Sequence, residues 1–75
     1  MTRPILRYLA TVPDASATEV AEALEMSVPA AGMALLRLAR SGLAVRSSDP
    51  GRGCLFYALT PKGKARLAFF ETRRL

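Results

Sequence analysis

The stretch SATEVAEALEMSVPAAGMALLRLARSGL, residues 16–43, contains two helix starts and one helix end, and it decides the fold. Ser16, followed three residues later by Glu19, fits a capping box, in which each side chain accepts a hydrogen bond from the other residue's backbone N–H. Ser27 is the cap candidate of a second helix. Gly42 ends that helix, because glycine readily adopts the left-handed conformation needed there. The stretch therefore predicts a short helix, a tight turn and a longer helix.

Apolar residues in this stretch recur at helical spacing, so each helix has one face directed inward. The inward stripe of the short helix consists of Ala17, Val20, Ala21 and Leu24. The longer helix covers residues 28–41, and its inward positions are Ala31, Leu35 and Leu38. Its opposite face is then formed by Pro29, Met33, Leu36 and Arg40, with Ala30 and Arg37 at one flank. A rotation error of about 60° would instead place Met33 and Leu36 in the core.

The segment before this stretch predicts a further helix. Thr2 is its cap candidate, and Pro4 suits its first turn. The core residues of this helix are Ile5, Leu6 and Leu9. Pro13 ends it, because the residue before a proline is forced out of helical geometry.

After the longer helix, the period of the apolar residues changes to the alternation typical of strands. LAVRS alternates, which places Leu43 and Val45 inward and Arg46 outward. SDPGRG, residues 48–53, is a turn by composition. CLFYALT predicts a second strand, with Leu55, Tyr57 and Leu59 on the inner face and Phe56 and Ala58 on the outer face. Two strands around a Gly/Pro turn predict a hairpin.

A last helix begins at Thr60-Pro61. Its predicted apolar face is formed by Ala65, Ala68 and Phe69, with Leu67 and Phe70 directed elsewhere. Three cations near its start oppose the helix dipole, namely Lys62, Lys64 and Arg66. They form either a solvated face or a group with an electrostatic use. The predicted order is helix, helix, helix, strand, strand, helix, which makes a mainly α domain with a two-stranded β hairpin.

The composition indicates one small domain over residues 1–75 with an uneven charge. Residues 1–36 contain two basic and four acidic residues, a net charge of −2, whereas residues 37–75 contain nine basic and two acidic residues, a net charge of +7. A basic C-terminal half suits a polyanionic partner, and a solvated basic surface is the other explanation.

Several classes of function are disfavoured. Cys54 is the only cysteine and the chain has no histidine, so we expect neither an intramolecular disulfide nor a metal site. Glu19, Glu22 and Glu25 follow helical spacing as a solvated face, and the chain has no Gly-rich phosphate loop, so we expect neither an enzyme nor a cofactor. No uncharged run approaches the ~18 residues of a membrane helix and we see no secretory signal, so we expect a cytoplasmic protein without membrane contact.

Three motifs, ATEVAEALEMS, LLRLARSGLAVR and YALTPKGKA, occur in this order within residues 4–70. Together they resemble the winged helix-turn-helix regulators of bacteria and phages, and the MarR type most of all. The resemblance implies that residues 28–41 are the recognition helix, which enters the major groove of double-stranded DNA, and that residues 43–59 are the wing. We also expect a homodimer through the last helix. Either that interface or the last helix itself would cover Phe56, Leu67 and Phe70.

The outward face of the recognition helix lacks most of the polar residues that read base edges. We therefore predict that DNA is bound mainly through its phosphates. The predicted phosphate contacts are Ser27 with the helix N-terminus, Arg37, Arg40, Arg46 and, at the wing tip, Arg52. The predicted apolar contacts, for instance with thymine methyl groups, are Pro29, Ala30 and Met33.

The alternative is a winged helix that binds a protein. In that case Pro29, Met33 and Leu36 form an exposed apolar stripe that contacts another regulator or a larger complex. The basic residues would then be solvated or would face an acidic partner.

Overall fold

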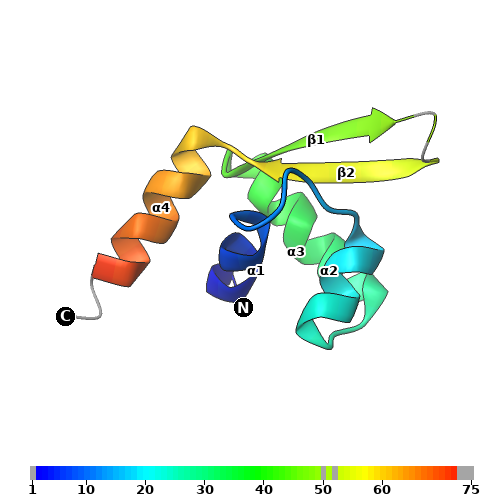
Figure 1. Cartoon of the computed structure of the whole chain (residues 1–75), viewed down its shortest axis with the longest axis horizontal. Helices are drawn as coiled ribbons and strands as arrows, with labels where there is room; N and C mark the ends of the chain where they lie inside the picture. Colours follow the sequence, from blue (N-terminus) through cyan, green and yellow to red (C-terminus); the bar gives the residue numbers. More distant parts are fainter. Residues whose placement is uncertain (1, 50, 52, 73–75) are drawn as a thin grey trace.

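The computed structural model describes residues 2–49, 51 and 53–72. Within them the chain forms α1 (Thr2–Leu9), α2 (Ala17–Leu24), α3 (Val28–Arg40), β1 (Ala44–Asp49), β2 (Cys54–Leu59) and α4 (Pro61–Thr72). Figure 1 shows the first three helices gathered beneath the hairpin, which extends to one side, while α4 extends to the other. The order and type of the six elements confirm the predicted fold class.

One hydrophobic core joins the first three helices to the base of the hairpin. Its largest fully buried side chains are Ile5, Leu6, Leu9, Val20 and Leu35. The three predicted inward positions of α3 are all buried. In α2, Val20 and Ala21 are buried and Ala17 and Leu24 pack half-buried against the same core. Full burial of one large aliphatic side chain contributes roughly 1.5–3 kcal/mol, so the inward stripe fixes which face of α3 meets solvent.

Hydrogen bonds confirm both helix starts predicted in residues 16–43. The Ser16 N–H donates to Glu19 Oε1 at 2.8 Å, and the Glu19 N–H donates to Ser16 Oγ at 3.2 Å. Ser27 caps α3 in the same way, because its Oγ accepts from the Ala30 N–H at 3.2 Å. Gly42 follows the end of α3 with a φ of 78°, the left-handed conformation expected there. Thr2, predicted as the cap that precedes the first helix, is instead the first residue of α1.

The first strand departs from the predicted alternation. Leu43 is buried and Arg46 exposed, as predicted, but Val45 is 55% exposed and its neighbour Ala44 is buried. The prediction for Val45 is therefore wrong. The chain leaves α3 through the turn at Gly42, two consecutive residues, Leu43 and Ala44, enter the core, and β1 is exposed from Val45 to Ser48.

In the second strand, two neighbouring residues are buried although they lie on opposite faces. Phe56, predicted on the outer face, is buried together with Tyr57. Strand β1 pairs antiparallel with one edge of β2, and Ala15 pairs with Tyr57 from the other edge, through N–H···O bonds of 2.8 and 2.9 Å. The base of the hairpin is thus enclosed by neighbouring segments, whereas Leu55, predicted inward, lies farther out and is exposed.

The predicted apolar face of α4 does not pack against the core. Ala65, Ala68 and Phe69 are exposed, and Leu67 is the residue that packs against the core. The side chain of Phe70 lies outside the described residues. The start of α4, as far as Leu67, lies against the core, and the helix then extends away (Figure 1), so only a short part of it is covered.

Candidate nucleic-acid interface

The outward face of α3 is the predicted one. Pro29, Ala30, Met33, Arg37 and Arg40 are all exposed. Met33 is 53% exposed, so the alternative rotation that would bury it is wrong. The exception is Leu36, which is half-buried at the border of this face. The exposed stripe is therefore apolar in its first half and cationic in its second.

The N-terminal end of α3 has few groups that can bind a phosphate. Pro29 has no N–H, and the N–H of Ala30 already donates to Ser27 Oγ at 3.2 Å. The first turn therefore offers an anion the Val28 N–H and the hydroxyl proton of Ser27, together with the positive end of the helix dipole. Ser27 can act there as a donor while its oxygen still caps the helix.

The C-terminal end of α3 supplies the cations. Arg37 and Arg40 lie in its last turn, where they also complement the helix dipole. The turn of residues 41–43 leads from there into β1, where Arg46 is exposed opposite Tyr57. The structure thus brings three predicted arginines onto two directly connected elements. Arg52 was predicted at the wing tip, and it lies outside the described residues.

An apolar hollow of about 260 Å³ lies beside the exposed stripe, at the level of Met33. Its lining residues are Ile5, Met26, Ala30, Met33, Ala34, Arg37 and Leu38. Ala30 and Ala34 leave room because they lie one turn apart and are small. Sequence reasoning missed this hollow, although that spacing was visible. It leaves space beside the flexible Met33 side chain.

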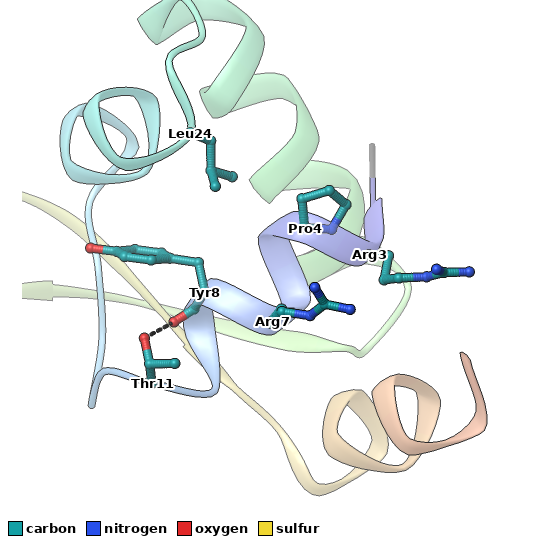
Figure 2. A pocket seen from close by; sticks show the side chains of 6 residues that line it. All are labelled: Arg3, Pro4, Arg7, Tyr8, Thr11 and Leu24. Atoms are coloured by element: carbon teal, nitrogen blue, oxygen red, sulfur yellow. Dashed lines mark hydrogen bonds between the residues drawn. The ribbon is translucent and has the colours of Figure 1, made fainter. Parts of the chain in front are cut away.

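A second hollow, of about 510 Å³, lies on α1 and contains none of the predicted site residues. Figure 2 shows Leu24 pointing toward Tyr8, whose ring extends to one side, while Arg3 and Arg7 extend to the other. Thr11 Oγ1 donates to the Tyr8 carbonyl at 2.7 Å and closes the C-terminal end of α1. The two arginines are one helical turn apart and share one side of α1, which the sequence could have indicated.

Three further observations on the part of the chain that the structure describes concern metal ligands, the cysteine and the length of the helices. No three histidine, cysteine or acidic side chains gather there as metal ligands. Cys54 is a free thiol, exposed at the start of β2. None of the helices formed by residues 2–49, 51 and 53–72 combines the length and the apolar character needed to cross a bilayer.

Comparisons with known proteins agree on one family. The sequence profile of the MarR family matches residues 2–53. A solved MarR family transcription regulator has a TM-score of 0.88 and 30% identity, over 97% of this chain and 49% of that one. For a MarR family regulator from Silicibacter pomeroyi the TM-score is 0.83 at 26% identity, over 95% and 48% of the two chains. For Bordetella bronchiseptica BpsR, whose DNA binding is regulated by 6-hydroxynicotinic acid, the TM-score is 0.86 at 24% identity, over 95% of this chain and 51% of that one.

The chain spans about half the length of these solved structures. No curated protein sequence matches it. The matches confirm the winged helix-turn-helix fold and the resemblance on which the sequence analysis relied. They lend no support to the protein-binding alternative, because the matching structures are those of transcription regulators.

Proposed function

This chain belongs to the MarR family of transcription regulators, and we propose that it binds double-stranded DNA in the cytoplasm, with residues 1–75 acting as one DNA-binding domain and not as an enzyme. The observation that carries the proposal is the outward face of α3, where Pro29, Ala30 and Met33 are exposed between a capped N-terminus and a cationic last turn. In this arrangement α3 enters the major groove and the hairpin lies beside it as the wing.

Phosphate contacts supply most of the affinity in this proposal. One phosphate is bound at the start of α3 by the Ser27 hydroxyl and the Val28 N–H. The others are bound by Arg37, Arg40, Arg46 and Arg52. With ~4–6 phosphates bound per monomer, a plot of log affinity against log salt concentration should have a slope of about −4 to −5.

Base readout is limited to apolar contacts. Pro29, Ala30 and Met33 have no side-chain hydrogen-bond donor, so in the major groove they contact thymine methyl groups. The exposure of all three residues supports this role. Specificity then depends on the placement of thymines and on the shape of the duplex.

The first test measures binding of a fluorescent duplex of two helical turns by anisotropy, over a series of salt concentrations. Arg40→Ala should weaken binding and make the salt slope shallower by about 0.9. Arg52→Ala should do the same. Arg66→Ala is the matched control, because it removes the same charge from an exposed position on α4. Equal effects of Arg40→Ala and Arg66→Ala would reduce the proposal to non-specific attraction by net charge.

The second test concerns the bases. Replacing thymine by uracil throughout the best-bound duplex removes only the methyl groups. The wild-type chain should bind the uracil duplex more weakly, with the same salt slope, because the phosphates are unchanged. The variant Met33→Ala should discriminate less between the two duplexes. Equal wild-type affinity for both duplexes would exclude the apolar readout while leaving phosphate binding intact.

Dimer formation is the remaining part of the proposal. Phe69 is 52% exposed on α4, near the exposed Ala65 and Ala68, on the helix that extends away from the core. This supports self-association through α4. Light scattering should give the mass of a dimer for the wild-type chain and that of a monomer for Phe69→Glu. A monomeric wild-type chain at micromolar concentration would contradict this part alone.

A further inference from the structure

The first turn of α4 lies directly against the turn that ends α3. Three consecutive carbonyl oxygens accept hydrogen bonds there from two residues of the α4 start. Lys62 Nζ donates to the Ser41 carbonyl at 3.0 Å, Thr60 Oγ1 to the Gly42 carbonyl at 2.7 Å, and the Thr60 N–H to the Leu43 carbonyl at 3.1 Å. We call residues 41–43 and 60–63 together the α3–α4 junction.

Backbone geometry leaves little freedom in this junction. A Cβ at Gly63 would clash with the Leu43 carbonyl and would lie 2.7 Å from Leu59 Cδ1. A Cβ at Gly42 would lie 3.6 Å from both Cδ and Nζ of Lys62, so the lysine stem passes directly over the turn. The close contact at Gly63 therefore fixes the start of α4 on the turn, and Lys62 reaches back from there to the end of α3.

The position of Lys62 is unfavourable for its own helix but favourable for α3. A cation in the first turn of α4 opposes the dipole of that helix. The last carbonyls of a helix have no partners within it and carry partial negative charge, so a cation near them is stabilising. The ammonium of Lys62 lies at the carbonyl of Ser41, the residue that follows α3. Of the three cations near the start of α4, Lys62 thus has an electrostatic use.

We propose that Lys62 is a positioning residue for DNA binding. It restrains the last turn of α3, which carries Arg37 and Arg40, and so holds these two arginines where they meet phosphates. Lys62 itself contacts no phosphate. This inference rests on the proposed function, because it assigns Lys62 a part in the same DNA-binding surface.

The test uses the full chain and the fluorescent duplex described above. Lys62→Met removes the donor and keeps most of the stem. Lys64→Met is the matched control, because it removes the same charge from an exposed position two residues along α4. Lys62→Arg keeps a cationic donor and serves as the rescue variant. Circular dichroism establishes that all variants are folded at the temperature of the titration.

The stabilisation of a helix by a single cation at its C-terminus corresponds to about a 2- to 5-fold change in an equilibrium constant. We therefore expect Lys62→Met to weaken DNA binding by about this factor more than Lys64→Met does. The salt slope of the two variants should be the same, and Lys62→Arg should restore the affinity. A slope shallower by about 0.9 in Lys62→Met alone would show a direct phosphate contact and overturn the proposal. Equal affinities of the two methionine variants would also overturn it.

Hydrogen exchange of the free chain separates this inference from the proposed function. The N–H groups of Ser41, Gly42 and Leu43 donate to carbonyls of the last turn of α3. They should exchange faster in Lys62→Met than in the wild type, while the Val20 N–H in α2 is unchanged. If the wild-type chain binds no duplex, the proposed function fails, and faster exchange still supports the restraint by Lys62. Unchanged exchange overturns the restraint whether or not DNA binds.

Discussion

Helices α3 and α4 are both cationic, but they are held in the molecule in different ways. α3 is buried along its length by Ala31, Leu35 and Leu38. α4 contacts α1 and β2, but among its apolar side chains with a described burial only Leu67 is half-buried against the core, and its first turn, where Gly63 is buried, makes the contacts of the α3–α4 junction. The position of α3 therefore depends on hydrophobic burial, and that of α4 on close backbone packing and hydrogen bonds. The same kind of substitution should have different effects in the two helices.

The largest expected effect is that of Leu35→Ala. Leu35 is fully buried in the centre of the core, so truncation leaves a cavity and should lower the free energy of unfolding by about 2–5 kcal/mol. Phe69→Ala in α4 removes a larger side chain, but one that is half exposed, and should cost about 1 kcal/mol at most. Urea denaturation followed by circular dichroism measures both values. Equal losses would show that α4 is held by burial as well, contrary to the comparison.

The second prediction concerns the backbone contact that holds α4. Gly63→Ala should lower the free energy of unfolding by about 1–3 kcal/mol, because the added methyl group meets the Leu43 carbonyl and forces α4 to shift. Lys64→Ala, at the next and exposed position, should change it by about 0.5 kcal/mol or less. The same denaturation experiment applies. An unchanged midpoint for Gly63→Ala would mean that α4 moves freely on the turn.

The third prediction compares the residues that cap the two helices. Thr60 accepts from the Gly63 N–H at 3.0 Å and also donates to the Gly42 carbonyl, whereas Ser27 makes the single capping bond described above. Thr60→Ala should therefore cost about 1–2 kcal/mol, and Ser27→Ala about 1 kcal/mol or less. Thermal unfolding of both variants side by side measures the difference. The reverse order would show that the bond to Gly42 adds nothing.

The sequence predicted the first three helices well, because their position is encoded locally. The capping box of Ser16 and Glu19, the cap at Ser27 and the spacing of Ala31, Leu35 and Leu38 each depend on residues within about one or two turns. These signals also placed Met33 and Arg40 on the outward face of α3, which is the main part of the candidate site.

The hairpin and α4 were predicted less well, because their faces are decided by distant segments. Phe56 is buried next to Tyr57, and the backbone of Tyr57 pairs with Ala15, a residue about forty positions earlier, at the other edge of β2. The use of Lys62 depends on a carbonyl 21 residues before it in the chain. Neither the pairing of Ala15 with β2 nor the hydrogen bond of Lys62 can be predicted from the alternation of apolar residues or from composition. The sequence showed only that Lys62 opposes its own helix dipole, and this conflict was the one visible sign of its role.

The smallest expected effect has the opposite sign and uses the glycine of α3. A Cβ at Gly32 would lie 3.9 Å from the Ala17 Cβ, an ordinary contact, and Gly32 is not among the glycines with positive φ. Gly32→Ala should therefore raise the free energy of unfolding by about 0.5–1 kcal/mol, since alanine restricts the unfolded chain and favours helix. The change is chemically identical to Gly63→Ala, so urea denaturation of the two variants gives a direct contrast. If both variants lose stability, the crossing of α2 and α3 is as tight as the α3–α4 junction, and the distinction between burial and backbone contact no longer separates the two helices.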